Sequence, residues 1–362
     1  MAVLRANGLG DLVFALPALE ALAAAYPDAE IVLLATAWHR ALLEARPGPV
    51  DRVVEVPPGV PGPAGGPDPA AADAFRTAMR AKRFDLALQM HGGGRTSNAV
   101  VAALGARVTA GFHTPDAPTL GRTLPYVYLQ PEILRYLELV ALVGAPPVGL
   151  EPRLAVTAAD RDEAAAVAGG AAAVVGEAAP LAVIHPGATD ARRRWPTERF
   201  AAVARVLAGE GVTVLVSGGT DEREVAARVV RESGGIARDV SGLLSLGGLV
   251  GLLAGAAVVV SNDSGPLHLA AAVGTPTVGV FCGPNVVNST WPTRERHRPL
   301  AALSAACPRC GADTLARDCG HRDSLVATVR TEDVVAAARD LLDLPASDPR
   351  ALARALDPRA GP

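Results

Sequence analysis

The stretch RANGLGDLVFALPALEAL, from Arg5 to Leu22, shows the fold class at the start of the chain. A short apolar run precedes a turn with Gly8 and Gly10, and a helical pattern of apolar residues follows. This order of strand, glycine loop and helix is how a dinucleotide-binding unit begins. The third glycine of that fingerprint is missing, and Asp11 places a carboxylate in the loop. The sequence alone leaves two roles open for Asp11: a helix cap, or a general base for an acceptor hydroxyl.

The composition indicates a globular protein with a large core. Of 362 residues, 50% are hydrophobic and 20% are charged. The net charge of −3 argues against nucleic acid as the main partner. Neither an apolar stretch of ~20 residues nor the pattern of a signal peptide is present, so a cytoplasmic location is expected. Lys82 is the only lysine, so cationic roles fall to arginine or histidine.

Apolar runs and helical periods alternate along the chain, which predicts an α/β protein with parallel sheets. Prolines interrupt the pattern between Ala145 and Val156, where we place a linker. We therefore expect an N-terminal Rossmann-like domain over residues 1–150, a C-terminal one over 151–345, and a tail over 346–362. Ligands of such sheets bind at the carboxyl ends of strands, and the expected site is a cleft between the two domains.

The segment SNDSGPLHL, from Ser261 to Leu269, follows a predicted strand and opens a helix. The free N–H groups of Ser264 and Gly265 at this helix start are suited to a phosphate. His268 lies in the first turn. The alternative is an ordinary capped helix with Asp263 as the cap and His268 packed beside it.

Two further loops of the C-terminal half follow predicted strands. HPGATDARRRWP, from His185 to Pro196, contains three adjacent arginines, which can bind a diphosphate bidentately or form a solvated basic loop. VSGGTDERE, from Val216 to Glu224, places Glu222 where it can accept hydrogen bonds from ribose hydroxyls. An acidic first turn that complements the helix dipole is the alternative.

Taken together and in order, these loops resemble glycosyltransferase family 9, the ADP-heptose:lipopolysaccharide heptosyltransferases, which have the two-domain GT-B fold. The resemblance rests on GLGDLVFALPAL, DLALQMHGGGRTS, HPGA with RRWP, SGGTDE, and NDSGPLHLAAAVGTPTVGVF, within residues 3–284.

The resemblance implies inverting transfer of a heptose or similar sugar, with Asp11 as catalytic base. No cofactor is expected beyond a nucleotide-diphospho-sugar co-substrate, with ADP-heptose as the expected donor. It further implies donor binding by the C-terminal half, and we assign this role to His185, Gly187, Arg193, Arg194, Gly218, Glu222, Leu246, Asp263, Ser264, Gly265, Pro266 and His268. Arg193 stands where the family commonly has lysine, so the charge is kept on a planar group.

The expected acceptor is a glycan, glycolipid or small molecule, and a lipid-linked acceptor would bring the protein to the inner membrane face. Acceptor binding is assigned to Gly8, Gly10, His91 and Arg95, with the loop from Pro57 to Ala71 as a further candidate. Two other functions stay open: a nucleotide-sugar 2-epimerase on the same fold, and a catalytically silent sugar-nucleotide-binding protein. A Rossmann dehydrogenase fits least, because the third glycine is absent.

No metal is expected for the reaction, since the loops hold no D-x-D-type carboxylate pair. Three cysteines and a histidine nevertheless cluster in CPRCGADTLARDCGH, as Cys307, Cys310, Cys319 and His321. This set is suited to structural zinc. Reduced thiols that pack a loop are the preferred interpretation, zinc the second and a disulfide the third.

Overall fold

The computed structural model describes residues 1–58, 60, 68–172, 179–290 and 295–343. The chain divides into two compact units, Met1–Ala155 (unit 1) and Val156–Pro362 (unit 2). The division falls inside the predicted proline-rich linker. Most of the loop from Pro57 to Ala71 and the predicted tail over 346–362 lie outside the described residues.

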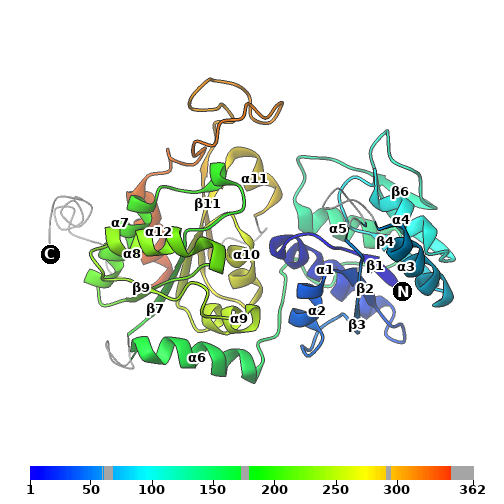
Figure 1. Cartoon of the computed structure of the whole chain (residues 1–362), viewed down its shortest axis with the longest axis horizontal. Coiled ribbons are helices and arrows are strands. Elements are labelled where there is room, and N and C mark those ends of the chain that lie inside the picture. Colours follow the sequence, from blue (N-terminus) through cyan, green and yellow to red (C-terminus); the bar gives the residue numbers. More distant parts are fainter. Residues whose placement is uncertain (59, 61–67, 173–178, 291–294, 344–362) are drawn as a thin grey trace. The chain divides into compact units, whose positions relative to one another are not determined.

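Unit 1 is a parallel sheet with helices packed against it (Figure 1). Its strands, in their order across the sheet, are β3 (Arg52–Glu55), β2 (Val32–Ala35), β1 (Ala2–Leu4), β4 (Leu86–Gln89), β5 (Val108–His113) and β6 (Arg122–Pro125). The helices are α1 (Leu9–Ala25), α2 (Ala37–Leu43), α3 (Pro69–Ala81), α4 (Ser97–Ala103) and α5 (Glu132–Ala141). This strand order is that of a Rossmann fold.

Unit 2 repeats the same order with its own strands and helices (Figure 1). Across the sheet lie β9 (Arg238–Asp239), β8 (Thr213–Val216), β7 (Leu181–His185), β10 (Val258–Asn262), β11 (Thr277–Cys282) and β12 (His297–Ala302). The helices are α6 (Ala158–Ala172), α7 (Thr197–Gly209), α8 (Arg223–Glu232), α9 (Leu246–Ala254), α10 (Gly265–Ala272), α11 (Gly283–Asn288) and α12 (Thr331–Leu341), with short 3₁₀ turns at Ala191–Arg193 and Thr220–Glu222.

The central strands of both sheets are buried on both faces, as their continuous apolar sequences require. In unit 1, Leu4 of β1 is in register with Leu34 of β2 and Gln89 of β4. In unit 2, Ser261 of β10 is in register with His185 of β7. Residues that follow these strands therefore gather at one edge of each sheet, where the predicted loops lie.

Helix α12 begins one residue earlier than the sequence predicts. The sequence favours Thr331 as the N-cap, whereas Arg330 has the extended backbone of the cap and Thr331 is the first helical residue. Glu332 and Asp333 in the first turn complement the helix dipole. Among the described residues, none of the helices is both long enough and apolar enough to cross a membrane.

Candidate active site

A cavity of about 300 Å³ in unit 2 collects seven of the residues predicted to bind the donor. It lies at the carboxyl ends of β7 and β8, beside the start of α10. The seven are His185, Gly218, Glu222, Leu246, Ser264, Gly265 and Pro266. A larger cavity of about 560 Å³ runs beside β8 and β9 and contains none of the predicted residues. The smaller cavity is therefore the candidate site.

Glu222 and His185 form one wall of this cavity. Glu222 Oε2 accepts a hydrogen bond from the backbone N–H of Gly219 at 2.9 Å and lies 3.6 Å from His185 Nε2. Burial lowers the pKa of His185, and the charge of Glu222 opposes that shift. The side chain of Glu222 is 19% exposed, so the carboxylate faces the cavity with acceptor capacity left for a hydroxyl.

Gly187 and Gly218 make room for that carboxylate. A Cβ atom at Gly187 would lie 1.9 Å from Glu222 Oε1, and one at Gly218 would lie 3.2 Å from Glu222 Cβ. Gly187 does not line the cavity itself. Its contribution is space, because no larger residue fits beside Glu222 in this arrangement.

The opposite wall is the start of α10. Ser264 is the N-cap with an extended backbone, and Gly265 and Pro266 form the first turn. The unpaired N–H groups of a helix start and the helix dipole attract anions. Apolar side chains, Val240, Leu244, Leu246 and Leu249, line another part of the cavity. The cavity thus combines an anion site, a carboxylate and an apolar surface.

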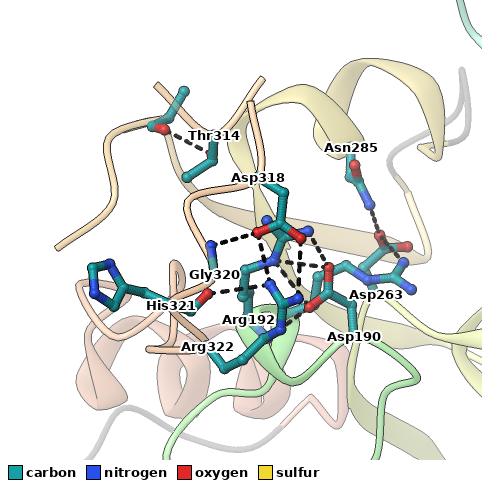
Figure 2. A network of polar contacts seen from close by, with 11 residues as sticks. Asp190, Arg192, Asp263, Asn285, Thr314, Asp318, Gly320, His321 and Arg322 are labelled. Atoms are coloured by element: carbon teal, nitrogen blue, oxygen red, sulfur yellow. Dashed lines mark hydrogen bonds and ion pairs between the residues drawn. The ribbon is translucent and has the colours of Figure 1, made fainter. Parts of the chain in front are cut away.

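Asp263 lies behind this wall, 2% exposed, and does not line the cavity. Its Oδ1 is 3.0 Å from His268 Nε2, and its Oδ2 is 3.3 Å from Arg193 Nη1. The same Oδ2 accepts a hydrogen bond from Asn285 (Figure 2). Burial by itself raises the pKa of Asp263, but the hydrogen bonds from His268 and Asn285 and the charges of His268 and Arg193 lower it overall. Asp263 is not the helix cap, and its visible role is to position Arg193 and His268.

The arginine loop, residues 186–195, is held by Asn262 at the end of β10. The Asn262 side chain donates to the carbonyls of Pro186 and Gly187, and it accepts the backbone N–H of Trp195 at 2.9 Å. Trp195 is buried in the core of unit 2. These contacts fix both ends of the loop.

The three arginines of this loop have different partners. Arg192 binds Asp190 through two nitrogen atoms, and Arg194 donates to the Ala188 carbonyl at 2.8 Å. Arg193 reaches Asp263, and its side chain is 29% exposed. The loop is therefore an ordered structure, and a freely solvated basic segment does not describe it.

Asp11 of unit 1 lies in the first turn of α1, and its side chain is 41% exposed. Its Oδ2 accepts the backbone N–H of Gly8 at 3.0 Å, and its Oδ1 lies 2.8 Å from Arg5 Nη2. The Arg5 side chain is 1% exposed, donates to the Met90 carbonyl at 2.6 Å and stacks over Tyr136. Asp11 thus caps the helix, and part of its carboxylate faces solvent.

The other predicted residues of unit 1 divide into two groups. His91 follows β4, and its Nδ1 lies 3.3 Å from the backbone N of Ala6, so the loop after β4 contacts the loop after β1. Gly8 is the N-cap of α1, and Gly10 lies in its first turn. Arg95 forms the second group, because its side chain is 79% exposed and pairs with Asp116.

Four residues that shape these sites were not predicted from the sequence: Arg5, His39, Asn262 and Asn285. A signal existed for Arg5, which is a charged residue directly after an apolar strand, and for Asn262, which ends one. His39 and Asn285 each lie in the first turn of a helix that directly follows a strand.

His39 makes unit 1 sensitive to acid. It is fully buried, with Thr36 Oγ1 2.8 Å from its Nδ1, and burial together with the charges of Arg5 and His91 lowers its pKa to about 3. An unfolded histidine takes up a proton near pH ~6.5, so the unfolded state gains stability as the pH falls. The free energy of unfolding should therefore decrease by about 2 kcal/mol between pH 7 and 5 from this residue.

Hydrogen exchange of the amides in β1 and β2 at the two pH values measures this loss. In His39→Asn, whose side chain can still accept a hydrogen bond from Thr36, the loss should be smaller by that amount. An equal loss in both proteins would contradict the assignment.

Comparison with solved structures finds proteins of the same fold as this chain. The fold resembles that of the glycosyltransferase family 9 protein from Veillonella parvula, with a TM-score of 0.77 and 20% identity over 94% of this chain and 97% of that one. It also resembles ADP-heptose lipopolysaccharide heptosyltransferase II of E. coli, with a TM-score of 0.72 and 22% identity over 94% and 98%. The molecule is therefore an α/β protein of the two-domain GT-B class.

Sequence comparison adds the family. The model of glycosyltransferase family 9 (heptosyltransferase) matches residues 73–310. Lipopolysaccharide heptosyltransferase 2 of Salmonella typhimurium is 31% identical over 130 residues, a match that spans 34% of this chain and only 37% of that protein. The chain belongs to glycosyltransferase family 9.

Proposed function

We propose that this chain is an inverting glycosyltransferase that moves a heptose, or a similar sugar, from an ADP-linked donor to an acceptor hydroxyl. The acceptor is a glycan, a glycolipid or a small molecule. One observation carries the proposal: the cavity of unit 2 places an anion site, a carboxylate and an apolar surface together, and a nucleotide diphosphate needs all three. Family membership and the names of the similar proteins, which specify heptosyl transfer, support the sugar class.

Unit 2 holds the donor in this proposal. The diphosphate binds the N–H groups at the start of α10 and Arg193, Glu222 accepts hydrogen bonds from the ribose, and Leu246 and its apolar neighbours pack against the base. The sugar lies near Asp263 and His268. The diphosphate gains negative charge as it leaves. Arg193 and the helix N–H groups therefore stabilise the transition state more than the bound donor.

Unit 1 supplies the base and the acceptor-binding residues. Asp11 takes the proton of the acceptor hydroxyl, and the acceptor oxygen bonds to the anomeric carbon from the face opposite the diphosphate. The bond between that carbon and the diphosphate oxygen breaks, and its electron pair leaves with ADP. The configuration at the anomeric carbon is inverted. Gly8 and Gly10 leave space for the acceptor, and His91 borders the same loops.

Transfer in this scheme uses arginine and helix N–H groups where other enzymes use a divalent ion. Added Mg²⁺ or Mn²⁺ should therefore leave turnover unchanged within about twofold. The check is the initial rate of ADP release with and without each ion. A rate that depends on the ion would contradict this part of the proposal.

A lipid-linked acceptor would bring the protein to the inner membrane face. Binding of the protein to vesicles that contain the acceptor would detect this.

Titration calorimetry with ADP, UDP and GDP tests the donor pocket, and Gly187→Ala is its sharpest variant. ADP should bind best to the wild type. A methyl group at residue 187 would displace the carboxylate end of Glu222. The hydrogen bonds from the ribose to that carboxylate would be lost, so ADP affinity should fall by about 5- to 150-fold.

Gly209→Ala is the matched control, because a Cβ atom there meets no other atom within 4 Å. Its ADP affinity should equal that of the wild type. Equal ADP affinity in Gly187→Ala, or no preference among the three nucleotides, would argue against the assigned pocket.

A further inference from the structure

The segment between β12 and α12 gathers four metal-binding side chains in unit 2. One ligand atom each from Cys307, Cys310, Cys319 and His321 lies within 4.8 Å of all the others. Cys307 Sγ is 3.5 Å from His321 Nδ1. A tetrahedral zinc ion, with bonds of ~2.3 Å to sulfur and ~2.0 Å to nitrogen, requires sulfur–nitrogen separations of ~3.5 Å and sulfur–sulfur separations of ~3.8 Å. The separation of Cys307 and His321 matches such a site, and all the other separations lie within 4.8 Å.

The backbone around the first two cysteines forms a tight turn. Gly311 has a φ of +70°, its N–H donates to the Cys307 carbonyl at 2.9 Å, and the N–H of Cys307 donates to the Ala312 carbonyl at 2.8 Å. This turn brings Cys307 and Cys310 together as a first pair of metal ligands.

We propose that Cys307, Cys310, Cys319 and His321 bind a structural zinc ion. Three thiolates and one imidazole fill a tetrahedral coordination sphere, which leaves no position for a substrate and so excludes a catalytic role for the ion. Soft sulfur ligands in this geometry favour zinc over magnesium or calcium. The inference stands independently of the proposed transferase activity.

The local structure explains why a metal would be needed here. Between β12 and α12 the described chain forms only an isolated bridge, Ala306 to Asp313, and turns, so few backbone hydrogen bonds hold it. In Figure 1 this orange segment extends beyond β11 and α11. A bound ion would replace the missing regular structure as the main constraint on its conformation.

The same segment contacts the arginine loop. The backbone N–H of Leu325 donates to the Arg192 carbonyl at 2.8 Å, and Ser324 Oγ donates to the Arg194 carbonyl at 2.6 Å. Figure 2 shows the Asp318–Arg322 ion pair beside the Asp190–Arg192 pair. The zinc ion would therefore also hold the loop that presents Arg193.

The direct test is the metal content of the full chain, purified in a reductant without added metal, by inductively coupled plasma mass spectrometry. We expect about one zinc per chain. Cys319→Ser should lower the zinc content at least fivefold. Cys282→Ala, which removes the buried cysteine at the end of β11, should keep it.

Cobalt substitution gives a second readout on the wild type, in case Cys319→Ser fails to fold. The cobalt protein should show thiolate-to-metal charge transfer and the strong visible bands of a tetrahedral site. Removal of zinc should speed hydrogen exchange in residues 190–194. Three results would each overturn the proposal. They are a zinc content near zero with four reactive thiols, a protein mass lower by two hydrogen atoms because of a disulfide, and iron bound in place of zinc.

Discussion

Replacement of Asp11 by Asn is expected to lower kcat by about 10²- to 10⁴-fold, the usual contribution of a general base. The amide oxygen of the new side chain can still accept a hydrogen bond from Arg5, so the buried guanidinium keeps a partner and the fold should survive. ADP affinity should stay at the wild-type value, because the donor pocket belongs to unit 2. The measurements are steady-state kinetics and ADP calorimetry on the same preparation.

Asp28→Asn is the matched control for this experiment. Asp28 is exposed in the turn that follows α1, and its replacement should leave kcat unchanged. An Asp11→Asn protein that folds, binds ADP and turns over near the wild-type rate would remove Asp11 from the chemistry. Its role would then be limited to capping α1 and pairing with Arg5.

Replacement of Arg193 by Ala is expected to lower kcat by roughly 10²-fold, since one preorganised donor to a developing charge is worth about that much. Asp263 holds this guanidinium in place, and the partial exposure of its side chain gives it access to a ligand. The loss should fall mainly on kcat, because the interaction strengthens as the diphosphate departs. Arg193→Lys should recover part of the rate, since charge is kept while the planar geometry is lost.

The comparison for Arg193 is Arg228→Ala, an exposed residue of α8 that pairs with Glu232. This variant should keep the wild-type kcat. If Arg193→Ala instead raised KM alone and left kcat intact, Arg193 would bind the ground state and the transition state equally. The stabilisation of the leaving group would then have to come from the helix start.

Much of the fold could be predicted from the sequence, because the central strands are continuous apolar runs followed by glycine or helix-start signals. The strands β1, β7 and β10 and the helices α1 and α10 follow this rule. The sequence does not predict helix α6, because its alanine-rich stretch lacks an amphipathic pattern. The sequence does not predict the edge strand β6 either, because Arg122 and Pro125 break the apolar run.

In the candidate site, too, some residues could be predicted from the sequence and others could not. Residues that end a strand or closely follow one, such as His185 and Glu222, could be located from sequence because parallel strands deliver their ends to one edge. Asn262 and Arg5 could not be assigned, because they act on backbone groups 67 to 85 residues away. The pairing of Asp263 with Arg193 likewise joins residues 70 apart and has no local signature.

The central claim is sugar transfer from an ADP-linked donor, and its most direct measurement is mass spectrometry of the reaction products. The full chain is incubated with ADP-heptose, with and without a panel of acceptors that carry free sugar hydroxyls. We predict an acceptor heavier by one heptosyl residue, an inverted linkage by NMR, and an equal amount of released ADP. An isomerised sugar nucleotide formed without acceptor, or a bound donor that no acceptor consumes, would contradict it.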